Sequence, residues 1–150
     1  MVPSVLMTDI VVGVDGSEES LAALSWAAGQ ARLLHARVVA VHAWEPVGRR
    51  LAPYASVAAC PTAAEQREQA ARVLRDSLLK TLGERVDIVV QPVLAEGAPA
   101  RVLLERARDA VLIAVGRSAH GRGELSAAGP VVRECLRYAR VPVIAVPVEP

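Results

Sequence analysis

The chain has 150 residues, a length that fits one domain with a full-sized core, and 53% of its residues are hydrophobic. Its formal net charge of +1 is dispersed along the sequence and only 3% of its residues are aromatic, so neither a basic stripe nor a stacking platform for nucleic acid is expected. No apolar run is long enough to span a membrane, and residues 1–12 lack the positive charge and cleavage site of a secretory signal.

The two cysteines indicate a reducing compartment. Cys60 and Cys135 have no CxxC spacing and no companion ligands, which favours free, buried or semi-buried thiols over a metal site. Because free thiols are typical of reducing conditions, we expect a cytoplasmic protein.

The first half of the chain predicts two strands separated by a helix. Residues 9–14 form a β-branched run, and the turn Asp15-Gly16-Ser17 leads into a helix that Ser17 caps and that reaches about His35. The second strand covers residues 37–43. The core face of the helix is expected to comprise residues at helical spacing, namely Leu21, Leu24, Ala28, Ala31 and Leu34.

The second half repeats the alternation after a long connection over residues 44–61, which is rich in proline. A second helix runs from a Thr62 cap to Gly83. Its buried stripe is predicted to be Val73, Leu74, Leu78 and Leu82. The remaining elements are a strand over 86–94, a short helix over 97–108, a strand over 111–115, a helix over 130–138 and a strand over 141–147.

This alternation predicts a single α/β domain over residues 1–150, with its core at about 8–147. The fold is a doubly wound, five-stranded parallel sheet with helices on both faces. Ligands of such sheets bind beyond the carboxyl ends of the strands. Asp15 follows the first strand and Gly116 follows the fourth, so both belong to that end.

The stretch 111–132 combines a buried strand, a glycine-bearing loop and the helix start Gly129-Pro130. Backbone N–H groups in such a place can bind an anion. Two alternatives stay open here. Gly129-Pro130 also suits an ordinary helix start, and Asp15 also suits the chemistry of its own turn.

No catalytic or metal site is predicted. Lys80, the only lysine, lies inside a helical pattern, where neither a P-loop nor a Schiff base would place it. A nucleophile elbow requires a glycine two residues after its serine, but His120 stands two residues after Ser118. His35, His42 and His120 lack the spacing of metal ligands.

Four segments together resemble the universal stress protein (UspA) family. They are 12–17 with 22–27 (VGVDGS and AALSWA), 41–44 (VHAW) and 141–147 (VPVIAVP), and the resemblance extends from about Thr8 to Pro147. It implies a Rossmann-like fold of the adenine-nucleotide alpha-hydrolase type with strand order 3-2-1-4-5. It also implies a homodimer that pairs through its last strand, Val141 to Val146. Separately, the heavy use of Ala, Val, Arg, Gly and Pro is typical of a GC-rich bacterial genome.

One branch of that family binds ATP through a loop written G-x2-G-x9-G-S/T. Laid onto this chain, Gly116, Ala119, Gly129 and Pro130 take the four marked positions. An alanine forced to positive φ costs about 1 kcal/mol or more. Proline removes both a hydroxyl and a backbone N–H, although the N–H of Val131 stays available.

The adenine side of the site carries over better. Asp15 matches the family's acidic residue after the first strand, and Val41 matches the position beside the base. The cofactor expected from the resemblance is therefore ATP, with AMP as the alternative.

Three function classes follow. The leading hypothesis is a non-catalytic, dimeric stress-response regulator that senses adenine nucleotide. The second is a family member that has lost nucleotide binding and acts through contacts with a protein partner that the sequence does not name. The third is a slow ATPase. A phosphorelay receiver is disfavoured, because the chain lacks clustered acids after its first strand and a lysine after its last.

Overall fold

A computed structural model describes residues 7–46, 61–85, 87–117 and 129–148. Strands and helices alternate along the chain as the sequence predicts. They are β1 (Asp9–Gly13), α1 (Glu18–Leu34), β2 (Arg37–Trp44), α2 (Ala63–Leu82), β3 (Val89–Glu96), α3 (Pro99–Arg106), β4 (Leu112–Gly116), α4 (Gly129–Tyr138) and β5 (Val143–Val146).

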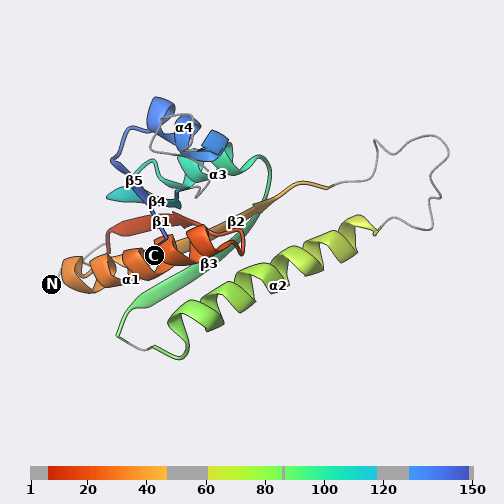
Figure 1. Ribbon diagram of the computed structural model, residues 1–150, viewed down its shortest axis with the longest axis horizontal. Coiled ribbons are helices and arrows are strands. Elements are labelled where there is room, and N and C mark those ends of the chain that lie inside the picture. The colour runs from red at the N-terminus through yellow and green to blue at the C-terminus, as the bar shows by residue number, and fades with distance from the viewer. Residues whose placement is uncertain (1–6, 47–60, 86, 118–128, 149–150) are drawn as a thin grey trace, which may run out of the picture.

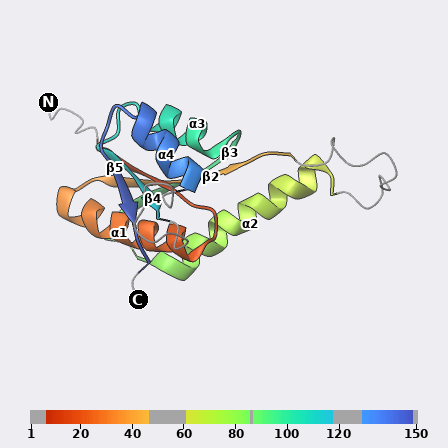
Figure 2. The ribbon, with the colours of Figure 1, turned by 45° about the horizontal axis from the view of Figure 1, so that its top comes forward.

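The five strands form one parallel sheet in the order β3-β2-β1-β4-β5, which confirms the predicted fold class and strand order. Helices α1 and α2 cover one face of the sheet, and α3 and α4 cover the other (Figures 1 and 2). Each face has its own apolar core. One core contains Ile10, Leu24 and Leu74, and the other contains Val11, Leu103 and Ile113. The central strand β1 contributes to both.

The predicted helix ends are confirmed at three caps. The Ser17 and Thr62 side chains accept hydrogen bonds from the backbone N–H groups of Ser20 and Glu65. Gly83 ends α2 at a positive φ of 59°. These residues satisfy backbone groups that a helix leaves unpaired at its ends.

The predicted core face of α1 is wrong at its last member. Leu34 is 49% exposed, and Leu21 is only half-buried. Helical spacing would bring position 35 to the buried face after Ala31, but the chain leaves the helix at His35, which is exposed and adopts a left-handed φ of 53°. The residues that α1 buries are Ser20, Ala23, Leu24, Ala27, Ala28 and Ala31.

The stripe of α2 is correct only in part. Leu74 and Leu82 are buried, whereas Val73 and Leu78 are half-buried. Ala70 and Ser77 complete the buried face, the latter by donating its hydroxyl to the Val73 carbonyl at 2.7 Å. A small polar residue bonded to its own helix can thus take a core position that a search for apolar residues misses.

Two strand boundaries differ from the prediction for a common reason. Strand β3 runs over Val89–Glu96 rather than 86–94, because its register follows β2 from Arg37↔Val89 to Trp44↔Glu96. Strand β5 covers only Val143–Val146, because it pairs with Ile113 to Gly116 of β4. Strand length is set by the neighbouring strand, which a local pattern does not contain. Most of the predicted connection over 44–61 lies outside the described residues.

Candidate functional site

A pocket of about 130 Å³ lies at the carboxyl ends of β1, β2 and β4. We call it the strand-end pocket. It is bounded by the turn after β1, the first turn of α1, and the starts of α3 and α4. Its lining residues are Gly13, Val14, Asp15, Ser17, Glu19, Ser20, Val41, Ala43, Pro99, Leu103, Val115, Gly116, Val131 and Val132. The pocket thus brings together four of the residues that the sequence selects: Asp15, Val41, Gly116 and Val131.

Asp15 is held by the two serines of the helix start. Both the backbone N–H of Ser17, at 2.9 Å, and its hydroxyl, at 2.5 Å, donate to Asp15 Oδ1. The backbone N–H of Asp15 donates to the hydroxyl of the buried Ser20 at 3.2 Å. The turn chemistry expected for Asp15 is therefore confirmed, and the same residue also lines the pocket.

The electrostatics of the turn keep Asp15 charged. Partial burial alone would raise the pKa of Asp15, but hydrogen bonds from the hydroxyl and backbone N–H of Ser17, the nearby Ser20 hydroxyl and the proximity of His42 outweigh it and lower the pKa below its ordinary 3.8. The carboxylate is therefore ionised at neutral pH. Because both bonds from Ser17 end on Oδ1, Oδ2 retains capacity to accept from hydroxyl groups of a ligand.

Gly116 brings β4 against the first turn of α1. A Cβ atom at this position would lie 2.5 Å from the carbonyl oxygen of Glu19 and 2.7 Å from its Cβ. Real side chains do not approach a backbone so closely, so only glycine fits. The glycine fixes where Glu19 and Ser20 border the pocket.

Ala43 is a pocket residue that sequence reasoning missed. It lies two residues after Val41 on β2, so both side chains point to the same face of the sheet. The predicted strand over 37–43 already includes Ala43, and its period-two alternation places Ala43 on the same face as Val41.

The start of α4 forms the last wall. Gly129 has a φ of 77°, a conformation that favours glycine, and the exposed Pro130 follows it in the first turn. The prediction of a helix start here is confirmed, and a role for both residues in phosphate binding stays a prediction. Neither lines the pocket, whereas Val131 does. Ala119, Ser118 and His120 lie outside the described residues.

The histidines and the cysteine that the structure describes contact the protein's own backbone or core. His35 ends α1, and His42 Nδ1 lies 2.7 Å from the Val14 carbonyl oxygen. Cys135 is a buried free cysteine, and burial raises the pKa of its thiol to about 11, so it is unreactive at neutral pH. Cys60 lies outside the described residues.

Within the described ranges, no three His, Cys, Asp or Glu side chains are grouped as metal ligands. No helix in those ranges is both long and apolar enough to cross a membrane.

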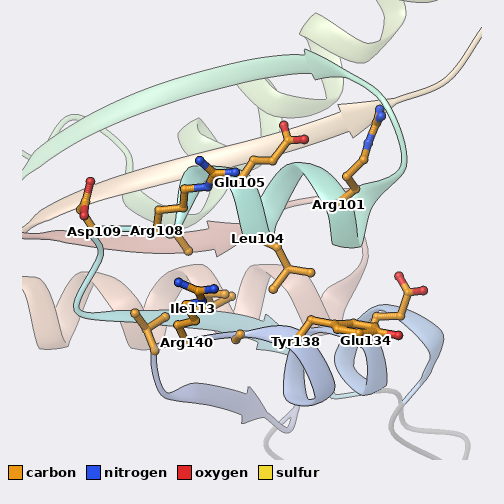
Figure 3. A pocket seen from close by; sticks show the side chains of 12 residues that line it. Arg101, Leu104, Glu105, Arg108, Asp109, Ile113, Glu134, Tyr138 and Arg140 are labelled. Carbon is orange, nitrogen blue, oxygen red and sulfur yellow. The ribbon is translucent and has the colours of Figure 1, made fainter.

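A second, larger hollow of about 690 Å³ lies between α3 and α4, near the amino end of β4. Figure 3 shows Leu104 and Ile113 in its middle, with charged side chains around them. These charges are of both signs: Arg101, Arg108 and Arg140 against Glu105, Asp109 and Glu134. Because they offset one another, this hollow does not indicate a ligand of either charge.

Comparison with known proteins identifies the family. Residues 7–147 match the model of the universal stress protein family. A universal stress protein from Mycolicibacterium smegmatis is 34% identical over 151 residues, which cover 97% of this chain and 50% of that protein. The chain thus spans about half the length of the curated relatives that it matches.

Solved structures share the fold of this chain. A protein of the universal stress protein family from Burkholderia pseudomallei is 29% identical, with a TM-score of 0.67 over 97% of this chain and 99% of that one. A universal stress protein in complex with cAMP has a TM-score of 0.66 at 22% identity, covering 95% and 98% of the two chains. The sheet order, the match over nearly the whole chain and these relatives together show that the chain belongs to the universal stress protein family.

Proposed function

We propose that this chain is a non-catalytic, regulatory stress-response protein that binds an adenine nucleotide in the strand-end pocket. The observation that carries the proposal is that Asp15, Val41, Gly116 and Val131, far apart in the sequence, line one pocket. It lies at the carboxyl edge of a parallel sheet, where ligands of this class of fold bind.

The chemistry of the pocket suits a nucleoside. Val41, Ala43, Leu103 and Val115 give it apolar walls, and its 130 Å³ is close to the roughly 150 Å³ in which a single benzene ring is known to bind. A base fits these walls, and the Asp15 carboxylate at the rim can accept hydrogen bonds from ribose hydroxyls. Other universal stress proteins have been solved with cAMP, with AMP and with dAMP.

The phosphate side favours AMP over ATP. Glu19 and Asp15 bring negative charge to the pocket, and Pro130 offers neither a hydroxyl nor a backbone N–H at the start of α4. Each missing hydrogen bond to a charged oxygen is worth roughly 1.5–3 kcal/mol. A monophosphate depends less on these groups than a triphosphate does.

Isothermal titration calorimetry with AMP and with MgATP tests the proposal. We expect AMP to bind at least as tightly as MgATP. Asp15→Asn, which retains an acceptor for Ser17, should weaken AMP binding about tenfold, equivalent to roughly 1.4 kcal/mol. Asp109→Asn, a matched change in the hollow between α3 and α4, should leave AMP binding unchanged. No heat from either nucleotide at millimolar concentration would overturn the proposal and favour action through protein contacts alone.

Restoring the family's loop residues should shift the preference. In the double variant Ala119→Gly with Pro130→Ser, we expect ATP binding to tighten at least tenfold, because serine returns both a hydroxyl and a backbone N–H to the first turn of α4. AMP binding should change less. Calorimetry with both nucleotides measures the two effects, and an unchanged ATP affinity would mean that positions 119 and 130 do not face the phosphates.

The proposal extends to assembly, activity and location. Strand β5 is an edge strand, so it can pair with the same strand of a second copy in a homodimer, which sedimentation velocity measures directly.

A non-catalytic role predicts no phosphate release from MgATP beyond that of a buffer blank, and sustained release would favour the slow ATPase. The free Cys135 suits the reducing cytoplasm.

A further inference from the structure

Val14, the residue before Asp15, is held by two successive residues of β2. Its backbone N–H donates to the Val41 carbonyl at 2.8 Å. Its carbonyl oxygen lies 2.7 Å from His42 Nδ1. Because a carbonyl can only accept, Nδ1 of this half-buried imidazole carries the proton and donates.

The second bond replaces a rung of the sheet. Along β2, the backbone groups of odd-numbered residues face β1, as the bonds from Arg37 N–H to Thr8 and from Val14 N–H to the Val41 carbonyl show. Even-numbered residues face β3, since the Trp44 carbonyl accepts from Gly97 N–H. In a regular parallel ladder the next rung would join Ala43 N–H to the Val14 carbonyl.

That rung is absent from the described part of the chain. The pairing of β1 with β2 ends at Gly13↔Val41, whereas β2 continues to Trp44. The Val14 carbonyl is bonded to the His42 side chain instead, and no backbone hydrogen bond joins it to Ala43. The Ala43 N–H therefore faces the side where β1 has ended, and Ala43 itself lines the strand-end pocket.

We infer that His42 is a positioning residue: by holding the Val14 carbonyl, it keeps the Ala43 N–H free to donate to a ring nitrogen of a bound adenine. This inference rests on the proposed nucleotide binding for its ligand. The His42 side chain never needs to touch the nucleotide, since it acts through the backbone of Val14 and Ala43. The hydrogen bond from His42 to the Val14 carbonyl, which we call the clamp, also fixes the orientation of the peptide group that leads into Asp15.

Two near-isosteric variants separate this role from general packing. Asparagine places an N–H close to the position of Nδ1, so His42→Asn should keep the clamp. His42→Leu has similar bulk and no donor. We expect AMP affinity to fall about tenfold in His42→Leu and to stay within about twofold of wild type in His42→Asn.

Amide hydrogen exchange of Ala43, followed by NMR, reads out the mechanism directly. In the wild-type protein without nucleotide, Ala43 should exchange at least tenfold faster than Val41, and AMP should slow it. In His42→Leu, Ala43 should exchange slowly even without nucleotide, because its N–H can now complete the rung to Val14. Val12, in the centre of the sheet, serves as the internal control and should exchange alike in all three proteins.

The outcomes are distinct. If Ala43 exchanges as slowly as Val41 in the nucleotide-free wild-type protein, the inference is overturned without recourse to any variant. Equal AMP affinity in His42→Leu and wild type would also overturn it. If no protein binds AMP but His42→Leu slows the exchange of Ala43, the clamp is supported and the proposed nucleotide function is overturned.

Discussion

Replacing Gly116 with alanine is expected to destabilise the protein by about 1–3 kcal/mol and to weaken the proposed AMP binding with it. The added Cβ would meet the carbonyl carbon, carbonyl oxygen and Cβ of Glu19. Two of these atoms belong to the backbone of α1, so no side-chain rotation can make room. The end of β4 and the first turn of α1 must separate. Because Ser17 and Ser20 of that region hold Asp15, the pocket must change as well.

Gly29 provides the matched control. It is an exposed glycine in the interior of α1, and a Cβ there would meet nothing within 4 Å. Gly29→Ala should therefore stabilise the protein by about 0.5–1 kcal/mol, since alanine loses less conformational freedom in a helix. Urea denaturation measures both changes as shifts of the midpoint at constant slope. Equal stability of Gly116→Ala and wild type would contradict the close contact with Glu19.

The features that sequence could predict are those encoded locally. Ser17, Thr62 and Gly83 were identifiable as caps, because a cap depends on residues within one helical turn. Alternation of apolar runs with helical spacing predicts a doubly wound sheet. The strand order came from the family resemblance, since no local pattern says that β1 lies between β2 and β4.

The parts that sequence could not predict depend on contacts between distant segments. The need for glycine at 116 comes from Glu19, and the pattern around either residue contains no sign of the other. The contact of His42 Nδ1 with the Val14 carbonyl depends on β1 ending at Gly13, the residue before Val14. Asp15 lines the pocket while bonding to Ser17 and Ser20, so turn formation and pocket lining are compatible rather than alternative.

Leu24→Ala is expected to cost about 2–5 kcal/mol, the usual range for a buried leucine. Leu24 has no exposed surface and packs in the core that α1 shares with β1, β2 and β4, where Ile10 and Ala114 are equally inaccessible. Close-packed interiors collapse only partly around a deleted side chain, so the variant loses both transfer energy and contacts. For a domain of this size, the midpoint of thermal unfolding should fall by about 2–4 °C for each kcal/mol lost.

Leu33 tests whether burial, rather than the loss of any leucine from α1, sets the stability lost in Leu24→Ala. It lies in the same helix but is 74% exposed, so Leu33→Ala should change stability by less than about 0.5 kcal/mol. Both variants replace the same side chain with the best helix former, which cancels the effect of helix propensity. Calorimetric melting of the two proteins side by side measures the difference. Equal losses would mean that α1 faces the sheet in a different rotation, and the positions of Ser20 and Glu19 at the pocket would then be wrong too.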